Sequence, residues 1–352
     1  ILRVKFLTGL FDTPYQTDLA AADTEVESPE NEAVALQASR ESIVLLKNAD
    51  GLLPLDIDGV KTIAVCGPNA DEESYALGHY GPLAVDVTTV LEGIRAKAEG
   101  KAEVLYAKGC DLVDEHWPDS ELIDYPLTCG ENKSRSSLDL PGRQQQLLQA
   151  IQATGTPTVL VLINGRPLSV NWADRFVPAI VEAWYPGAHG GTAVADVLFG
   201  DYNPGGKLTV TFPKTVGQIP FNFPCKPSAQ VDGGKNPGPD GNMSRANGAL
   251  YPFGHGLSYT TFEYADLTVS PDTITPNQQA TIRLKVTNTG QREGDEVVQL
   301  YTRDVLSSVT TYEKRLAGFE RVHLLPGETK EVSFEIDRKH LELLDKDMQW
   351  VV

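Results

Sequence analysis

The stretch Thr158-Val-Leu-Val-Leu-Ile-Asn164, followed by Gly165-Arg-Pro167, decides the fold class of this chain. Its continuous apolar, β-branched residues predict a strand that is buried on both faces, and the glycine and proline predict a loop directly after it. Similar apolar runs lie at residues 62–66, 103–107 and 179–184, and helical patterns separate them at residues 89–98, 143–153 and 192–199. This alternation predicts an α/β domain with a mainly parallel sheet that helices cover on both faces. In such folds the ligand crevice lies at the carboxyl ends of the strands.

The α/β domain is predicted to begin with a helix at Ser28-Pro29-Glu30. Serine is a good N-cap, proline fits the first helical position, and early acidic residues suit the helix dipole. The apolar residues that follow extend the predicted helix to about Lys47-Asn48. Residues 1–27 are predicted to be a linker, and the α/β domain is predicted to span residues 28–202.

The second half of the chain has a different pattern. Residues 203–260 are rich in proline and glycine and predict a long connecting loop. Short alternating strands follow, at residues 281–287, 296–301 and 331–336, with turn sequences between them. Strands at this spacing predict an all-β sandwich of the fibronectin type III or immunoglobulin type over residues 261–352.

Composition excludes several functions. The net charge of −18 repels phosphate backbones, so we expect no nucleic-acid partner. The sequence has no apolar run of about 18 residues, so we expect no membrane span. The four cysteines and six histidines show no metal-ligand spacing, and we expect neither a metal nor another cofactor. Cys66 lies in an apolar strand pattern and is predicted to be a buried, small hydrophobic residue.

Several blocks of sequence resemble glycoside hydrolase family 3, and they occur in the family's order across residues 36–352. The blocks are Ala38-Ser-Arg-Glu-Ser-Ile-Val-Leu-Leu-Lys-Asn48, Leu138-Asp-Leu-Pro-Gly142, Asn164-Gly-Arg-Pro-Leu168, Ala183-Trp-Tyr-Pro-Gly187 and Tyr251-Pro-Phe-Gly-His-Gly-Leu-Ser-Tyr259. The resemblance implies three parts: an N-terminal (β/α)8 barrel, an α/β sandwich and a fibronectin type III-like domain. Residues 1–27 would then be the linker after a barrel that these 352 residues do not contain.

The resemblance also implies an activity. Members of the family hydrolyse terminal non-reducing β-D-glucosyl residues by a retaining double displacement, and their substrates include β-glucosides and cello-oligosaccharides. The barrel carries the aspartate nucleophile and most residues that hold the sugar. A loop of the α/β sandwich carries the acid/base glutamate.

Gly130-Glu131-Asn-Lys-Ser-Arg135 resembles the family's Gly-Glu-x-x-Asp-Arg loop, with serine in place of the aspartate. Glu131 is therefore the predicted acid/base, and Arg135 is a candidate to bind substrate. Glycoside hydrolysis needs one protonated and one ionised carboxyl group. A second carboxylate or burial would raise the pKa of the acid as this role requires. One alternative stays open, in which the acid is a member of the preceding acidic cluster Asp114, Glu115, Asp119, Glu121 and Asp124.

Aromatic residues and a histidine supply further candidates to bind substrate. His79 and Tyr80 follow the first strand of the sheet, in a loop that by resemblance leans toward the barrel. Trp117 is a candidate to stack on the C–H groups of a pyranose. Trp184 and Tyr185 lie at a strand end, and we expect them to pack against the long loop instead.

Other interpretations stay open. The chain could belong to a β-xylosidase, or form a non-catalytic carbohydrate-binding or scaffolding module. Glycan substrates favour a periplasmic or secreted location, and the long loop and the sandwich could form a homodimer contact. We also expect natural residues to be missing near Thr128-Cys129 and after Val352. The alternation of strands and helices predicts another helix and strand near Thr128-Cys129. The set of strands expected for a sandwich is incomplete at Val352.

Overall fold

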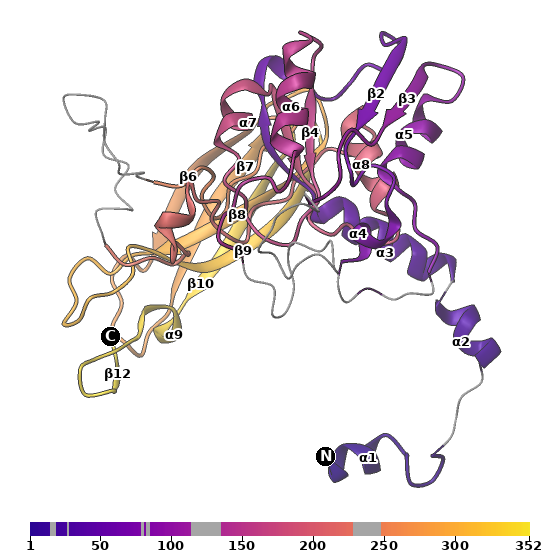
Figure 1. The fold of residues 1–352 in the computed structure, drawn as a ribbon. Helices are drawn as coiled ribbons and strands as arrows, with labels where there is room; N and C mark the ends of the chain where they lie inside the picture. The colour runs from indigo at the N-terminus through magenta and orange to yellow at the C-terminus, as the bar shows by residue number, and fades with distance from the viewer. Residues whose placement is uncertain (15–18, 27, 79–80, 82–84, 114–134, 228–247) are drawn as a thin grey trace, which may run out of the picture.

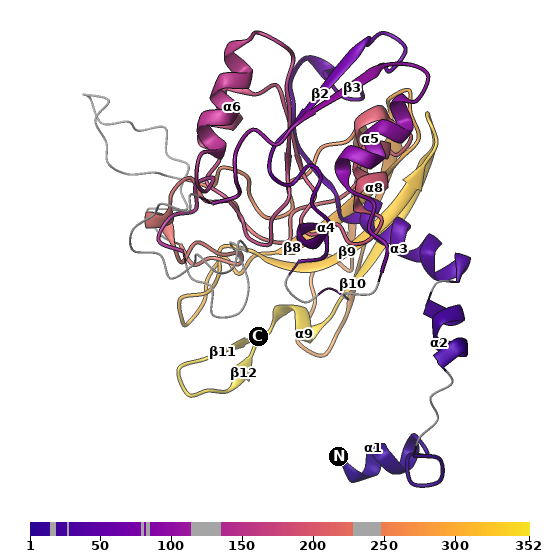
Figure 2. The same cartoon turned by 45° about the vertical axis from the view of Figure 1, so that its right-hand side comes forward.

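The computed structural model describes residues 1–352 except 15–18, 27, 79–80, 82–84, 114–134 and 228–247. An α/β domain and a β-sandwich lie side by side, and the N-terminal segment extends away from both (Figures 1 and 2). That segment holds two short helices, α1 (Leu2–Leu7) and α2 (Leu19–Val26), and α1 buries none of its residues. The linker role of residues 1–27 stays a prediction. In the described part of the chain, no helix is both long and apolar enough to cross a membrane.

Helix α3 (Pro29–Ser42) begins as predicted, and the Ser28 hydroxyl accepts a hydrogen bond from the Asn31 amide. The predicted extension to Asn48 is wrong, because residues 44–48 form strand β1 (Val44–Asn48). The run from Ile43 to Leu46 is at most 2% exposed. A strand whose sheet is covered on both faces buries successive side chains on opposite sides, whereas a helix in this position would bury one stripe.

The sheet of the α/β domain has strand order β1-β5-β4, with β5 (Ala179–Glu182) in the centre. Strand β4 (Val159–Leu162) runs parallel to β5, whereas β1 runs antiparallel to it. Strands β2 (Thr62–Cys66) and β3 (Glu103–Ala107) form a separate parallel pair. All four predicted strands are therefore present, and the added β1 makes the sheet mixed.

The exposure of Cys66 shows that its predicted burial is wrong. Thr62, Ala64 and Cys66 point to the same face of β2 and are all exposed, so the core covers only the other face of this strand. Val65 is buried and Ile63 is partly buried against the core, whereas Cys66 is turned away from them.

Helices cover two faces of the sheet, and Figure 2 shows α6 well apart from α5 and α8. Helices α5 (Val90–Ala98), α6 (Gln144–Ala153) and α8 (Gly190–Phe199) match the predicted ones. Helices α4 (Glu73–Leu77) and α7 (Asn171–Phe176) were not predicted.

Helices α5 and α8 touch backbone to backbone: a Cβ atom built on Gly93 would lie 2.1 Å from the Gly191 carbonyl oxygen. Only glycine fits there, so the two glycines set the helix spacing.

Asp196 of α8 ties three helices together. The residue is 1% exposed, and its carboxylate accepts a hydrogen bond of 2.8 Å from Arg40 Nε of α3. The Lys97 ammonium of α5 lies 2.6 Å from the other carboxylate oxygen. Lys97 also contacts the exposed Asp201 at 2.6 Å. A buried carboxylate with two cationic partners holds this side of the domain in register.

Asp196→Ala should lower the free energy of unfolding by about 3 kcal/mol, because it leaves two cations clustered without their buried partner. Urea denaturation followed by circular dichroism measures this loss. Asp201→Ala is the matched control, since it removes only the exposed partner of Lys97 and should cost less than about 1 kcal/mol. Equal losses in the two variants would contradict a special role for Asp196.

The β-sandwich follows the predicted pattern. One sheet contains β6 (Phe262–Ser270), β7 (Ala280–Asn288) and β10 (Thr329–Ile336), and the other contains β8 (Gly294–Thr302) and β9 (Arg315–Leu324). Strands β6 and β9 were not among the predicted ones. Alternate residues of β7 are buried, and Val286 packs with residues such as Val298 and Leu324 in the core between the sheets. The chain ends with helix α9 (Arg338–Leu341) and the pair β11 (Leu343–Leu344) and β12 (Trp350–Val351).

Polar contacts join the two domains. Arg321 of β9 lies 2.9 Å from Asp295 of β8 and donates a hydrogen bond of 3.3 Å to the Glu41 carbonyl oxygen of α3. Lys207, in the segment between the domains, forms a partly buried ion pair of 3.0 Å with Glu296. The sandwich is therefore attached to the α/β domain by specific, partly desolvated contacts.

Candidate active site

Most predicted site residues lie outside the described part of the chain, so the structure neither supports nor contradicts their roles. These residues are Glu131, His79, Tyr80, Trp117 and the acidic cluster from Asp114 to Asp124, together with the stretch at Thr128-Cys129. Their roles stay predictions. The described residues on both sides of them show how their loops are attached to the sheet.

Arg135 is the one predicted site residue within the described part of the chain. Its Nη2 donates a hydrogen bond of 2.6 Å to the Asp139 carbonyl oxygen. The Ser137 hydroxyl bonds the Asp139 carboxylate at 2.8 Å, so this segment is folded on itself. Arg135 therefore bonds its own loop, and its contact with substrate stays a prediction. The Leu138 carbonyl oxygen accepts a hydrogen bond of 2.8 Å from Ser169 N, which joins the segment to the loop after β4.

The loops after β4 and β5 meet at Glu182, the last residue of β5. Glu182 is fully buried. Asn164 Nδ2 lies 3.2 and 3.1 Å from the two carboxyl oxygens, and the Trp184 amide donates to one of them at 2.9 Å. The side chain thus binds one residue from each loop, at the sheet edge where parallel folds place their ligands.

Burial raises the pKa of Glu182 to about 8, whereas the hydrogen bonds from Trp184 and Asn164 lower it. Burial has the larger effect because it removes the charged form from water. Near neutral pH the group is therefore mostly a neutral carboxylic acid. Sequence reasoning did not identify Glu182, although an acidic residue at the end of the apolar run Ala179-Ile-Val-Glu182 is a visible signal.

The loop after β5 also supports the segment that precedes His79. A Cβ atom on Gly78 would lie 2.7 Å from the Tyr185 ring, and Gly187 N donates a hydrogen bond of 2.9 Å to the Ala76 carbonyl oxygen. Trp184 packs edge-on against Phe212, with ring centroids 6.0 Å apart. Phe212 belongs to the 203–260 segment, so the predicted packing of Trp184 against that segment is confirmed.

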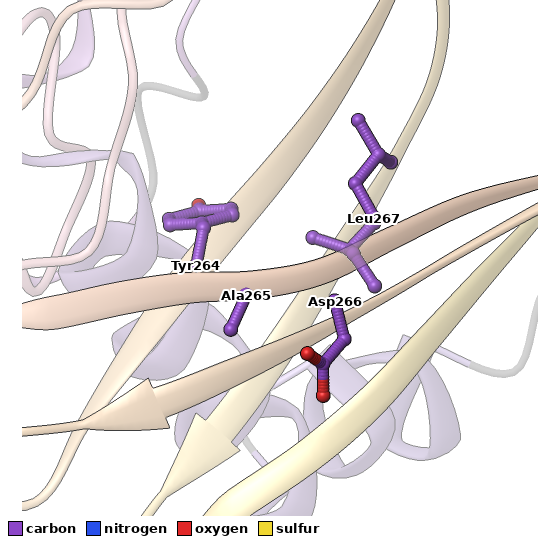
Figure 3. Close-up of a pocket in the computed structure, with 5 residues that line it drawn as sticks. Tyr264, Ala265, Asp266 and Leu267 are labelled. Atoms are coloured by element: carbon purple, nitrogen blue, oxygen red, sulfur yellow. The ribbon is translucent and has the colours of Figure 1, made fainter.

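A pocket lies on the sandwich at a β-bulge of β6 (Figure 3). Tyr264, Ala265, Asp266, Leu267 and Leu284 line it. Its polar groups already have partners, because Tyr264 bonds Glu296 at 2.6 Å and Asp266 bonds Lys285 at 2.8 Å. In the part of the chain that the structure describes, no three metal-ligating side chains form a cluster.

Comparison with known proteins identifies the family. Residues 43–259 match the glycosyl hydrolase family 3 C-terminal domain, and residues 296–352 match the fibronectin type III-like domain. The chain belongs to glycosyl hydrolase family 3, and it has that family's α/β sandwich followed by its fibronectin type III-like domain.

Similar proteins carry names of glycosidases. The chain is 42% identical to a beta-xylosidase of Formosa agariphila over all of its own length and 51% of that protein. It is 39% identical to a periplasmic beta-glucosidase of Salmonella typhimurium over 99% of its length and 51% of that protein. A solved b-glucosidase of Erythrobacter marinus has a TM-score of 0.85 and 35% identity, with 98% of this chain and 50% of that one covered. The chain thus spans about half the length of the relatives it matches.

Proposed function

We propose that this chain is part of a retaining β-glycosidase, in which it supplies Glu131 as the acid/base and a (β/α)8 barrel supplies an aspartate nucleophile. The Gly130-Glu131-Asn-Lys-Ser-Arg135 motif carries this proposal. It directly precedes the described segment that Ser169 attaches to the edge of the sheet. Family membership and relatives named as glycosidases support the same activity.

The proposed reaction has two steps. In the first, the aspartate attacks the anomeric carbon, the glycosidic C–O bond breaks, and Glu131 gives its proton to the departing oxygen. In the second, Glu131 takes a proton from water as the water oxygen attacks the anomeric carbon and releases the aspartate. Glu131 ends the cycle protonated, so it is regenerated.

We propose a terminal non-reducing β-D-glucosyl residue as the substrate, because several relatives, including those from Salmonella typhimurium and Erythrobacter marinus, are named as β-glucosidases. A β-xyloside is the second candidate, since a relative 42% identical to the chain is named as a beta-xylosidase. The name of the Salmonella protein supports a periplasmic location. The homodimer contact stays a prediction.

The complete enzyme, meaning this chain with the barrel that we propose, should hydrolyse aryl β-glucosides and release the β-anomer first. Proton NMR of the anomeric signals during the first minutes measures this directly. Aryl β-xylosides assayed in parallel decide the sugar through the ratio of kcat/KM values. An initial α-anomer would exclude the retaining mechanism, and no hydrolysis of either sugar would favour a non-catalytic module.

A further inference from the structure

The backbone of Trp184 has a conformation that needs support. Its φ is 57°, in the left-handed region that bulky residues rarely adopt. Such a residue persists only where its surroundings hold it, and residues of this kind cluster at functional sites. Here both backbone polar groups of Trp184 are held: its N–H donates to Glu182 at 2.9 Å, and its carbonyl accepts from Asn164 N at 3.1 Å.

Asn164 extends the same network into the loop after β4. Its side-chain nitrogen lies 3.1 Å from Glu182 Oε2, and its side-chain oxygen accepts from Arg166 N at 3.2 Å. The loop continues to Ser169, which bonds Leu138 in the segment after the predicted acid/base loop. On the other side, the loop after β5 places Tyr185 against Gly78. One buried side chain therefore binds two loops, and these loops contact segments that are close in sequence to Glu131 and His79.

We propose that Glu182 is a positioning residue of the active site, whose carboxyl group fixes the loops after β4 and β5 and thereby the segments that these loops hold. The proposal rests on the proposed function for its catalytic consequence. Glu182 acts through Asn164 and Trp184 and does not itself touch the substrate. Misplacement of catalytic groups by about 1 Å can cost roughly 100-fold in rate, so loop anchoring of this kind affects kcat.

Two substitutions of Glu182 distinguish the effect of its hydrogen bonds to the loops from the effect of its side-chain size. Glu182→Met keeps the length of the side chain but removes both acceptors, so Trp184 N and Asn164 Nδ2 lose their buried partner. Glu182→Gln keeps one acceptor oxygen and is close in shape to the neutral acid. Val181→Ala is the matched control, because Val181 is also fully buried in β5 but truncation there breaks neither side-chain bond to the loops.

In the complete enzyme at pH 6, Glu182→Met should lower kcat for an aryl β-glycoside by about 10-fold or more. Glu182→Gln and Val181→Ala should each stay within about 3-fold of wild type, although Val181→Ala also lowers thermal stability. Equal kcat values for Glu182→Met and Val181→Ala would overturn the proposal. A loss in Glu182→Gln as large as that in Glu182→Met would do the same.

Hydrogen exchange on the complete enzyme gives a readout that does not depend on activity. Peptides covering residues 164–169 and 182–187 should exchange at least about 10-fold faster in Glu182→Met and at an unchanged rate in Glu182→Gln. Unchanged exchange in Glu182→Met would show that the loops are held by other contacts and would refute the anchoring. If wild type hydrolyses no glycoside, the proposed function fails and the catalytic part of this proposal fails with it. The exchange rates then show by themselves whether Glu182 holds the loops after β4 and β5.

Discussion

Glu131→Gln should abolish most hydrolysis of cellobiose by the complete enzyme while leaving much of the activity on aryl glucosides with good leaving groups. A glutamine cannot protonate the departing oxygen, and general acid catalysis contributes about 100- to 10,000-fold. A nitrophenolate leaves without a proton, so its departure does not need the acid. We therefore expect kcat/KM for cellobiose to fall by at least about 100-fold and that for dinitrophenyl glucoside by less than about 10-fold.

The comparison between the two leaving groups is the measurement that assigns the role. An equal loss on both substrates would reject Glu131 as the acid and direct attention to the acidic cluster before it, from Asp114 to Asp124. Glu115→Gln and Glu121→Gln are then the matched variants, since each neutralises one carboxylate of that cluster. With Glu131 as the acid, these two variants should retain activity on both substrates.

The second large effect concerns the pH dependence of stability. The pKa of Glu182 is raised from 4.5 to about 8 in the folded chain, chiefly by burial. Between these values the folded state keeps a proton that the unfolded state releases, so stability falls as pH rises from about 4.5 to 8. Glu182→Gln removes this titration. The variant should therefore gain stability relative to wild type as pH rises, by about 4 kcal/mol between pH 4.5 and pH 9.

Urea denaturation of wild type and Glu182→Gln at pH 5, 7 and 9 measures this difference. Val181→Ala is the control again, because it changes no ionisable group and its destabilisation should be nearly constant across pH. A constant difference between Glu182→Gln and wild type would mean that Glu182 titrates alike in the folded and unfolded chain. That outcome would contradict its burial as a neutral acid.

Local patterns predicted much of the α/β fold. Apolar runs at residues 159–162 and 179–182 became strands, and Thr89 caps α5 through a reciprocal capping box with Glu92. The errors came from tertiary pairing. Ile43 to Asn48 has residues suited to either a helix or a buried strand, and only its pairing with β5 decides between them. Cys66 is exposed because it lies on the face of β2 that the core does not cover, and no local pattern reveals which face that is.

The candidate site, unlike the strands and helices, could not be predicted from local sequence patterns. The motif around Glu131 was visible only as a resemblance, because a glutamate in a polar loop has no local signature of catalysis. Glu182 and Asn164 could not be paired from sequence, since 18 positions separate them and parallel strands bring them together. The left-handed conformation of Trp184 also depends on that pairing.

The most direct test of the shared active site is the position of Glu131 in a crystal structure of the complete enzyme with a bound glucose analogue. We predict that its carboxyl group lies about 5–5.5 Å from the carboxylate of a barrel aspartate, with the anomeric carbon between them, as a retaining mechanism requires. A Glu131 side chain that points into bulk water, with no second carboxylate within about 10 Å, would contradict the account.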